Sequence, residues 1–344
     1  MRKVFEFIYN ELQHNRAVVS AVIVASSGST PRSAGSRMAV AAHGSTQGSV
    51  GGGPGEAWAQ REAHRVHQAG VSKLLKLDLT GKEAAEAGMI CGGRQEILVE
   101  YIPAHESTQE LFAGLLDSLD AGRGCSLCTV LTERCDDIRI LARTLNPESF
   151  PDVVPKPLRD KAVQKAFQAR LPLTAREENT TLLIEPIRSS GTLYIAGAGH
   201  VGKATADLAA YAGFRTIVLD DRTDFLHPSR FPRACKLHHV PEFAACFDQM
   251  DLPADSFIVI VTRGHVHDKT VLAQALRTPA QYIGMIGSRK KREAIYESLR
   301  GQGVSQSRLN TVHCPIGLSI GADTPEEIAV SIVGQLIHNR AQGE

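Results

Sequence analysis

The stretch from Leu193 to Asp221 constrains the fold of this chain more than any other part of the sequence. It begins with a short apolar run typical of a buried strand, followed by the sequence GAGHVG at positions 197–202. An apolar pattern of helical period comes next, and a second apolar run then ends on Asp220 and Asp221. A G-x-G-x-x-G pattern between a strand and a helix, with an acid at the end of the next strand, predicts a dinucleotide-binding Rossmann unit.

Each glycine of this pattern has its own physical task. We expect Gly197 to permit a tight turn, Gly199 to let a pyrophosphate approach the backbone, and Gly202 to let the helix pack closely on the strand. The helix that starts near His200 presents free N–H groups and a positive dipole end to phosphate. The acidic pair that ends the second strand is placed to accept hydrogen bonds from a ribose hydroxyl. A Rossmann-like unit without a ligand is the alternative, because fold alone does not fix function.

The length of 344 residues predicts two domains. We expect an α/β protein with an N-terminal mixed α/β domain over 1–187 and a C-terminal Rossmann-like, doubly wound parallel sheet over 190–344. The boundary lies where glycine-rich hairpins give way to regular strand–helix alternation. Within the first domain, the segment 104–187 carries the fewest signals.

The composition limits the partners and the compartment. Lys plus Arg is 38 and Asp plus Glu is 37, which gives no electrostatic reason to expect binding to nucleic acid or to an anionic membrane. The first residues predict an amphipathic helix rather than a signal peptide, and no apolar run approaches the ~20 residues that span a bilayer. The seven cysteines are an odd number in a long chain, which favours reduced thiols and a cytoplasmic protein.

The N-terminal part contains three glycine-rich loops, at 28–32, 48–53 and 88–93. Such loops can line an anion-binding concavity with backbone N–H groups, and Arg32 and Arg37 can add positive charge to a phosphate or pterin site. Cys91, followed by two glycines, suits a soft ligand or a sulfur carrier if its thiolate is stabilised. Turn chemistry alone favours the plainer interpretation, in which the glycines form tight turns and Cys91 is a small buried residue.

Two polar segments follow strands of the Rossmann half, at 262–268 and 287–292. Ligands bind outside the carboxyl ends of the strands in open α/β sheets, so both segments are expected at the ligand-binding edge. His265 and His267 suit acid–base groups or metal ligands; the alternative is a polar loop in which Asp268 caps the next helix. The basic segment that contains Ser288 and Arg289 suits phosphate, or forms an exposed helix face.

A C-x-x-C pair, Cys125 and Cys128, is followed by Cys135. The pair enters a predicted strand, in which residues three apart point to opposite faces of the sheet. No second pair at ligand spacing accompanies it in the sequence. A metal site is therefore not favoured here, and the sequence assigns these three cysteines no role.

Taken together, these motifs make the sequence resemble the XdhC/CoxI family, the accessory factors of xanthine dehydrogenase and related molybdenum hydroxylases. The resemblance covers most of the chain outside roughly 103–185. It rests on the following segments: GSTPR at 28–32 with Gly35 and Met38, GSVGGG at 48–53 with Glu56, CGG at 91–93, GAGHVG at 197–202, DDR at 220–222, TRGH at 262–265, YIGMIGSRKK at 282–291, and PIGL at 315–318 through Gly321 and TPEEIA at 324–329.

The resemblance implies a function that the motifs alone do not. Family members bind the molybdenum cofactor, protect it while a cysteine desulfurase sulfurates it, and deliver it to the apo-hydroxylase. For this chain it implies a cytoplasmic homodimer that partners an apo molybdenum hydroxylase and a cysteine desulfurase, with Cys91 in contact with molybdenum or its sulfur. The Rossmann half would hold NAD(P), another dinucleotide, or nothing.

The expected cofactor-binding residues can be named for the whole chain. In chain order they are Arg32, Gly51, Gly52, Gly53, Glu56, Cys91, Gly197, Gly199, His200, Gly202, Asp220, Asp221, Arg263, His265, Ser288 and Arg289. Two other classes of protein stay open at this point. One is an NAD(P)-dependent oxidoreductase that uses the Rossmann half, and the other is a docking scaffold that binds no cofactor.

Overall fold

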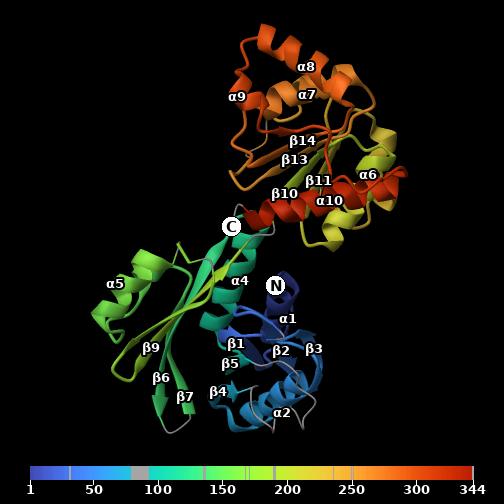
Figure 1. Ribbon diagram of the computed structural model, residues 1–344. Coiled ribbons are helices and arrows are strands. Elements are labelled where there is room, and N and C mark those ends of the chain that lie inside the picture. The colour runs from blue at the N-terminus through green and yellow to red at the C-terminus, as the bar shows by residue number, and fades with distance from the viewer. Residues whose placement is uncertain are drawn as a thin grey trace. The chain divides into compact units, whose positions relative to one another are not determined.

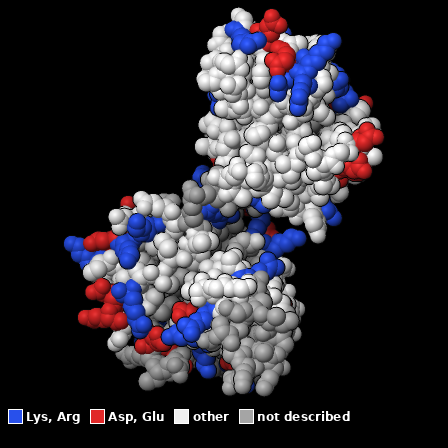
Figure 2. Space-filling model, viewed as in Figure 1, with Lys and Arg blue, Asp and Glu red and all other residues white. Residues whose placement is uncertain are grey.

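The computed structural model of the protein describes residues 1–30, 32–78, 93–134, 137–166, 168–169, 171–188, 191–234, 236–248, 250 and 252–342. Contacts between Cα atoms divide the chain into two compact units, Met1–Arg188 and Ser189–Glu344. Figure 1 shows the N-terminal unit in blue to yellow-green and the C-terminal unit in yellow to red. On the face drawn in Figure 2, basic and acidic side chains lie near one another in both units. In the described part of the chain, no helix is long and apolar enough to cross a membrane.

The N-terminal unit is built on one antiparallel sheet. Within the described residues its strand order is β3-β2-β1-β5-β4-β7-β6-β9-β8, and every neighbouring pair is antiparallel. The strands are β1 (Val18–Gly28), β2 (Arg37–Ala41), β3 (Thr46–Gly48), β4 (Ser72–Asp78), β5 (Gly93–Ile102), β6 (Cys125–Arg134), β7 (Asp137–Thr144), β8 (Leu173–Glu177) and β9 (Thr180–Ile187).

Helices cover both faces of this sheet. The helices are α1 (Arg2–Gln13), α2 (Gly53–Ala69), α4 (Glu106–Asp120) and α5 (Lys156–Lys165), with a short 3-10 turn at Pro147–Ser149. Successive side chains of β1 point to opposite faces, so Val18 packs with α1 and α4, whereas Val19 packs with α2. The helix α5 closes a third apolar cluster with β6, β8 and β9.

A buried polar network connects the two halves of the sheet. Backbone pairing between the halves is short, because among the described residues β4 and β7 share only the pairs Ser72–Ile138 and Lys73–Asp137. On the inner face Arg37 of β2 forms an ion pair with Glu185 of β9, and both side chains are almost fully buried. The expectation that Arg37 adds charge to a ligand site is therefore wrong, since its guanidinium is held in the core.

The C-terminal unit is a Rossmann fold. Its sheet has the order β12-β11-β10-β13-β14-β15 within the described residues, and all its strands are parallel. The strands are β10 (Thr192–Ala196), β11 (Arg215–Asp220), β12 (Lys236–His239), β13 (Phe257–Ile260), β14 (Tyr282–Met285) and β15 (Val312–His313). The order reverses between β10 and β13, which is the switch point where such sheets bind ligands. This confirms the predicted α/β fold class.

The helices of this unit lie on both sides of its sheet, as Figure 1 shows. They are α6 (His200–Tyr211), α7 (His265–Ala275), α8 (Arg289–Gly301), α9 (Gln306–Leu309) and α10 (Pro325–Gln342), with 3-10 turns at Thr223–Phe225, Pro228–Arg230 and Phe243–Ala245. One apolar cluster joins α6 and α10 to the sheet, and the other joins α7 and α8 to its opposite face.

A capping box begins α10. The Glu327 backbone N–H donates to the Thr324 hydroxyl at 3.2 Å, and the Thr324 N–H donates to the Glu327 carboxylate at 3.1 Å. In this helix Ile332 and Leu336 are fully buried, whereas Ile337 is 41% exposed.

Candidate functional site

The loop after β10 places its three glycines as the Rossmann pattern requires. Gly197 has φ +120°, and a Cβ there would lie 2.3 Å from the Val261 carbonyl oxygen. A Cβ on Gly202 would lie 1.9 Å from the Gly197 oxygen, so only glycine lets α6 pack this closely. A Cβ on Gly199 would meet nothing within 4 Å. Space therefore lies in front of Gly199, where a pyrophosphate binds in this fold.

Asp220, at the end of β11, is already engaged by neighbouring groups. Its carboxylate accepts hydrogen bonds from the Ala198 N–H at 2.7 Å and from the Arg222 N–H at 3.0 Å. The Arg222 guanidinium donates to both of its oxygens, at 2.8 and 3.0 Å. Burial acts to raise the pKa of Asp220, but hydrogen bonds from Arg222 and from the two backbone N–H groups outweigh it and lower the pKa.

This arrangement differs from the expectation of an acid open to a ribose. Asp220 is 1% exposed and anchors the glycine loop through Ala198. Arg230 donates a hydrogen bond to the carbonyl oxygen of Ala198 at 3.1 Å. Ala198 is thus held through both its N–H and its carbonyl group. The guanidinium of Arg222 lies 3.7 Å above the ring of Phe225. The roles of Arg222 and Arg230 in anchoring the glycine loop were not predicted from the sequence. The position of Arg222, two residues after Asp220, was the one feature that could have indicated its pairing with Asp220.

Asp221 forms an ion pair with Arg263 across the carboxyl end of β10. One nitrogen of the Arg263 guanidinium lies 2.7 Å from the carboxylate, and a second contact completes a bidentate pair. Because β10 lies between β11 and β13 in the sheet, this pair bridges the loops on either side of the glycine loop. The fold thus brings together two of the expected residues that are 42 positions apart.

The loops after β13 and β14 are joined by a buried carboxylate. Asp268 is fully buried and accepts from the Thr262 hydroxyl at 2.6 Å and from its N–H at 3.1 Å. The Lys291 ammonium of α8 donates to the other oxygen at 2.5 Å. The alternative in which Asp268 caps α7 is wrong, because Asp268 lies in the first turn of the helix and the N-cap is Gly264. Asp268 instead joins the two loops, and it neutralises the Lys291 ammonium.

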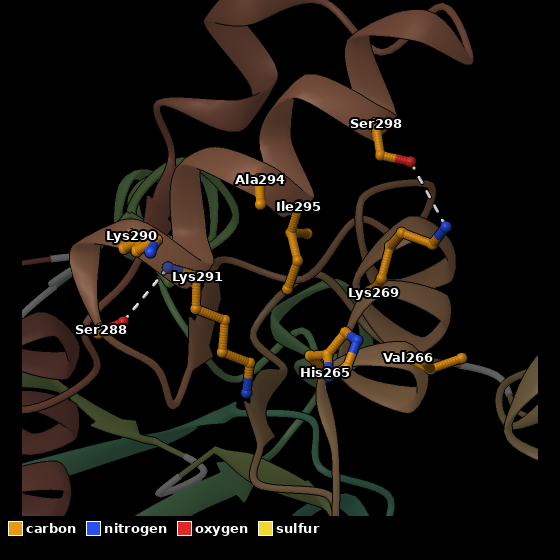
Figure 3. Close-up of a pocket in the computed structure, with 9 residues that line it drawn as sticks. All are labelled: His265, Val266, Lys269, Ser288, Lys290, Lys291, Ala294, Ile295 and Ser298. Carbon is orange, nitrogen blue, oxygen red and sulfur yellow. Dashed lines mark hydrogen bonds between the residues drawn. The ribbon is translucent and has the colours of Figure 1, made fainter.

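Between α7 and α8 lies a groove of about 590 Å³. We call it the α7–α8 groove, and Figure 3 shows its walls. It is lined by His265, Val266, Lys269, Ser288, Lys290, Lys291, Ala294, Ile295 and Ser298. Two of the expected site residues, His265 and Ser288, belong to it. Arg289 is exposed on the first turn of α8, and His200 lines a different hollow, of about 390 Å³, beside α6 and α10.

His265 and His267 do not form a metal-binding pair. They lie two positions apart on α7, and side chains at that spacing do not face each other on a helix. His265 faces the groove, whereas the ring of His267 packs against Phe243 at 5.3 Å. Among the described residues, no group of three or more His, Cys, Asp or Glu side chains is placed to hold a metal ion.

In the N-terminal unit, the first and second glycine loops leave the sheet at the same edge, because β1 and β3 both run antiparallel to β2. The first loop follows β1, the second follows β3, and the third leads into β5. Gly28, at the end of β1, pairs with Gly93, at the start of β5, and the rest of the third loop lies outside the described residues. Gln95 fixes the first loop by donating to the Arg32 carbonyl at 2.9 Å. The side chain of Arg32 is exposed at this edge.

The second glycine loop is closed by the carboxylate of Glu56. Its Oε2 atom accepts from the Gly52 N–H at 3.1 Å and from the Ser49 hydroxyl. The predicted phosphate seat is thus partly filled by the protein's own carboxylate at the start of α2. A Cβ on Gly52 or on Gly55 would meet nothing within 4 Å, so the outer side of this loop is open.

Four of the seven cysteines are buried or half-buried thiols. Burial raises the pKa of Cys125 and Cys314 to about 11 and that of Cys128 and Cys246 to about 12, so these thiols stay protonated at neutral pH. Cys125 and Cys128 pack into different clusters, as their spacing on a strand predicts. Cys91 and Cys135 lie outside the described residues, as does Cys235.

Comparisons with known proteins agree with this architecture. Residues 193–336 match the XdhC Rossmann domain, and residues 11–78 match the XdhC and CoxI family. A crystal structure described as a xanthine dehydrogenase from Bacillus halodurans has the same fold, with a TM-score of 0.79 and 24% identity, over 99% of this chain and 96% of that chain.

Two curated proteins are similar in sequence. The uncharacterized protein YqeB of Escherichia coli K12 is 35% identical over 153 residues, which are 44% of this chain and 28% of YqeB. The chain thus spans under a third of that relative. A protein of Bacillus subtilis 168, named as a probable subunit of xanthine dehydrogenase, is 28% identical over 96% of this chain and 95% of its own length.

The fold and the glycine loop define the class of protein: it is a two-unit α/β protein whose C-terminal unit is a Rossmann domain of the XdhC type. The matches in both units then identify the family, and the chain belongs to the XdhC and CoxI family.

Proposed function

We propose that this protein is an accessory factor of a xanthine dehydrogenase-type molybdenum hydroxylase. In this proposal it binds the molybdenum cofactor, holds it while a cysteine desulfurase sulfurates it, and assists its insertion into the apo-hydroxylase. The observation that carries the proposal is membership of the XdhC and CoxI family, with separate matches in the two units. The match to the Bacillus subtilis relative extends over nearly the whole chain, and the name of that relative supports xanthine dehydrogenase as the partner.

The edge where the first two N-terminal glycine loops leave the sheet is the place we propose for this cofactor. The cofactor brings a phosphate, a dithiolene and a soft metal whose sulfur is exchanged. Open space beside Gly52 and Gly55 and the exposed Arg32 are compatible with an anionic ligand at this edge. Glu56 would hold the shape of the loop rather than contact phosphate, since like charges repel.

Cys91 is the proposed contact to molybdenum or its sulfur. A sulfur ligand must be a thiolate, and the four described cysteines are held as protonated thiols by burial. Cys91 immediately precedes Gly92 and Gly93, and Gly93 begins β5 at the edge where β1 ends, paired with Gly28. Its position in the chain therefore brings it within reach of that edge.

The test compares Cys91→Ser with Cys125→Ser. We expect Cys91→Ser to lower retention of the molybdenum cofactor and activation of the apo-hydroxylase at least tenfold, because a hydroxyl does not replace a thiolate toward a soft metal. The variant Cys125→Ser alters a thiol whose pKa is raised by burial, and it should behave as wild type in both assays. Equal cofactor retention and activation by wild type and Cys91→Ser would remove Cys91 from the site.

Two measurements separate this proposal from the other classes of protein. Steady turnover of NAD(P) with a small substrate would identify an oxidoreductase that uses the Rossmann unit. Gel filtration with the apo-hydroxylase, with and without cofactor, separates a carrier from a docking scaffold. A carrier binds its partner differently in the two states, whereas a scaffold binds it equally in both.

A further inference from the structure

The acidic residue that a Rossmann unit usually offers to a ribose is already occupied in this chain. That residue ends the second strand of the unit, and here it is Asp220 of β11. Its two oxygens accept four hydrogen bonds, from the backbone N–H groups of Ala198 and Arg222 and from two nitrogens of the Arg222 guanidinium. A carboxylate has about four acceptor positions, and this side chain is 1% exposed. Asp220 therefore shapes the glycine loop and has no acceptor left for a ligand.

Asp221 is the next carboxylate along the chain, and its described contacts are of a different kind. It forms a bidentate ion pair with Arg263 and lies 4.0 Å from Arg222. The side chain of Asp221 is 14% exposed and that of Arg263 is 41% exposed. Ion pairs with this much exposure are weak, because water competes for both charges. A ligand that offers Asp221 a new donor can therefore separate the pair.

The ion pair lies at the ligand-binding edge, with one partner on each side of the glycine loop. On one side, the carboxylate that precedes Asp221 accepts from the Ala198 N–H at 2.7 Å. On the other side, the segment that leads to Arg263 packs against the loop, since a Cβ on Gly197 would lie 2.3 Å from the Val261 oxygen. A dinucleotide bound at this switch point brings its ribose to the end of β11. The ion pair thus occupies the place that the ribose would take.

We infer that the Asp221–Arg263 ion pair is a latch at the nucleotide-binding edge, and that Asp221 replaces Asp220 as the residue that selects the ribose. A dinucleotide separates the pair, and its ribose 2′-hydroxyl then donates to the Asp221 carboxylate in place of Arg263. The pyrophosphate lies in front of Gly199 at the start of α6. The ligand class is a dinucleotide with a free 2′-hydroxyl. The inference goes beyond the proposed accessory function and does not depend on Cys91.

The arginines near this edge do not reverse the preference for a free hydroxyl. The guanidinium of Arg222 is matched by Asp220, and that of Arg230 donates to two backbone carbonyl oxygens. A ligand with a 2′-phosphate that attracted Arg263 would leave the Asp221 carboxylate beside the phosphate without its counter-ion. Like charges at this distance repel, so the phosphate weakens binding.

The test is calorimetric titration of the full chain with NAD and NADP, two probes that differ only in the 2′-phosphate. Wild type should bind NAD at least about tenfold more tightly than NADP. Asp221→Asn removes the charge and keeps the shape of the side chain, and it should reduce this preference at least about fivefold. Glu293→Gln is the matched control, because it breaks the exposed ion pair with Arg292 on α8. It should leave both affinities unchanged.

Arg263→Gln tests the latch separately. It should strengthen NAD binding about two- to fivefold, because an exposed ion pair that is worth about that factor no longer has to be separated. The preference for NAD should remain, since Asp221 is still present. A merely structural role of Arg263 would instead weaken NAD and NADP binding equally, and thermal unfolding checks that each variant is folded. The inference is overturned by no NAD binding to wild type, by an unchanged preference in Asp221→Asn, or by weaker NAD binding to Arg263→Gln.

Discussion

At the scale of single residues, the loop after β10 contains glycines that the fold needs and one glycine, Gly199, with open space in front of it. Gly202 is required by packing, because its hydrogen atom faces the Gly197 oxygen where a Cβ would lie 1.9 Å away. Gly199 has open space in the same loop. The sequence pattern predicted both roles, since the spacing of the glycines reflects the approach of helix to strand.

Gly202→Ala should therefore destabilise the C-terminal unit by about 1–3 kcal/mol, the usual cost of overpacking a close contact. Gly199→Ala is the matched control and should cost less than about 1 kcal/mol, because it replaces a glycine at the N-cap of α6 without a clash. Urea unfolding followed by circular dichroism measures both. Equal stability of the two variants would contradict the packing role of Gly202.

Asp220 leads to a prediction about pH. Its pKa is lowered in the folded state from the ordinary value of 3.8. A carboxylate with a lowered pKa contributes stability at pH values above its unfolded pKa, and this contribution is lost as the pH falls through the folded pKa. The difference in unfolding free energy between wild type and Asp220→Asn should therefore be largest near pH 7 and shrink below about pH 4. A constant difference across that range would mean that the charge of Asp220 does not hold the glycine loop.

At the scale of elements, the N-terminal sheet depends on side chains where its backbone pairing is sparse. In the part of the chain that the structure describes, two register pairs join β4 to β7. Across the inner face, Arg37 of β2 pairs with Glu185 of β9 and also donates to the Ser20 hydroxyl of β1. Arg143 of β7 pairs with Glu100 of β5 in the same way, and burial lowers the pKa of Arg143 to about 10.

Removing one partner of such a pair leaves a buried charge without compensation. Glu185→Ala should destabilise the N-terminal unit by about 3–5 kcal/mol. The double variant Glu185→Leu with Arg37→Met should recover much of this loss, because buried ion pairs are often replaceable by apolar side chains of similar volume. Denaturant unfolding of the three proteins measures the effect. A double variant as unstable as Glu185→Ala would show that the charges themselves are needed.

The positions of long, strongly periodic helices and strands could be predicted from the sequence better than those of edge strands and of helices rich in basic residues. The glycine pattern and the buried strands of the Rossmann half lie as expected, because period and turn chemistry are local properties. The helix α8 was predicted only as a basic segment, since charged residues dominate its exposed side and obscure its apolar stripe. The strand β8 was missed because it is an edge strand in which only Ala175 is buried. Arg37 was misplaced because its partner Glu185 is 148 residues away.

At the scale of the whole molecule, the chain consists of two compact units with different sheet chemistry. The N-terminal sheet is antiparallel, whereas the C-terminal sheet is parallel and gathers its polar loops at the carboxyl ends of its strands. Each unit has its own apolar clusters. A unit with a complete core and a complete candidate site should fold and bind without the other.

We therefore expect a fragment comprising residues 189–344 to fold as a separate protein with a single cooperative unfolding transition. Titration calorimetry with NAD, NADP and cytosine nucleotides should give the same affinities for the fragment and the full chain, because Gly199, Asp221 and Arg263 all lie within it. Gly199→Val should abolish this binding in both, since its side chain occupies the space in front of the loop.

The fragment should not activate the apo-hydroxylase, because the proposed cofactor edge belongs to the other unit. No heat from any nucleotide with the wild-type chain would mean that its Rossmann unit binds no dinucleotide, and activation by the fragment alone would move the cofactor site into it.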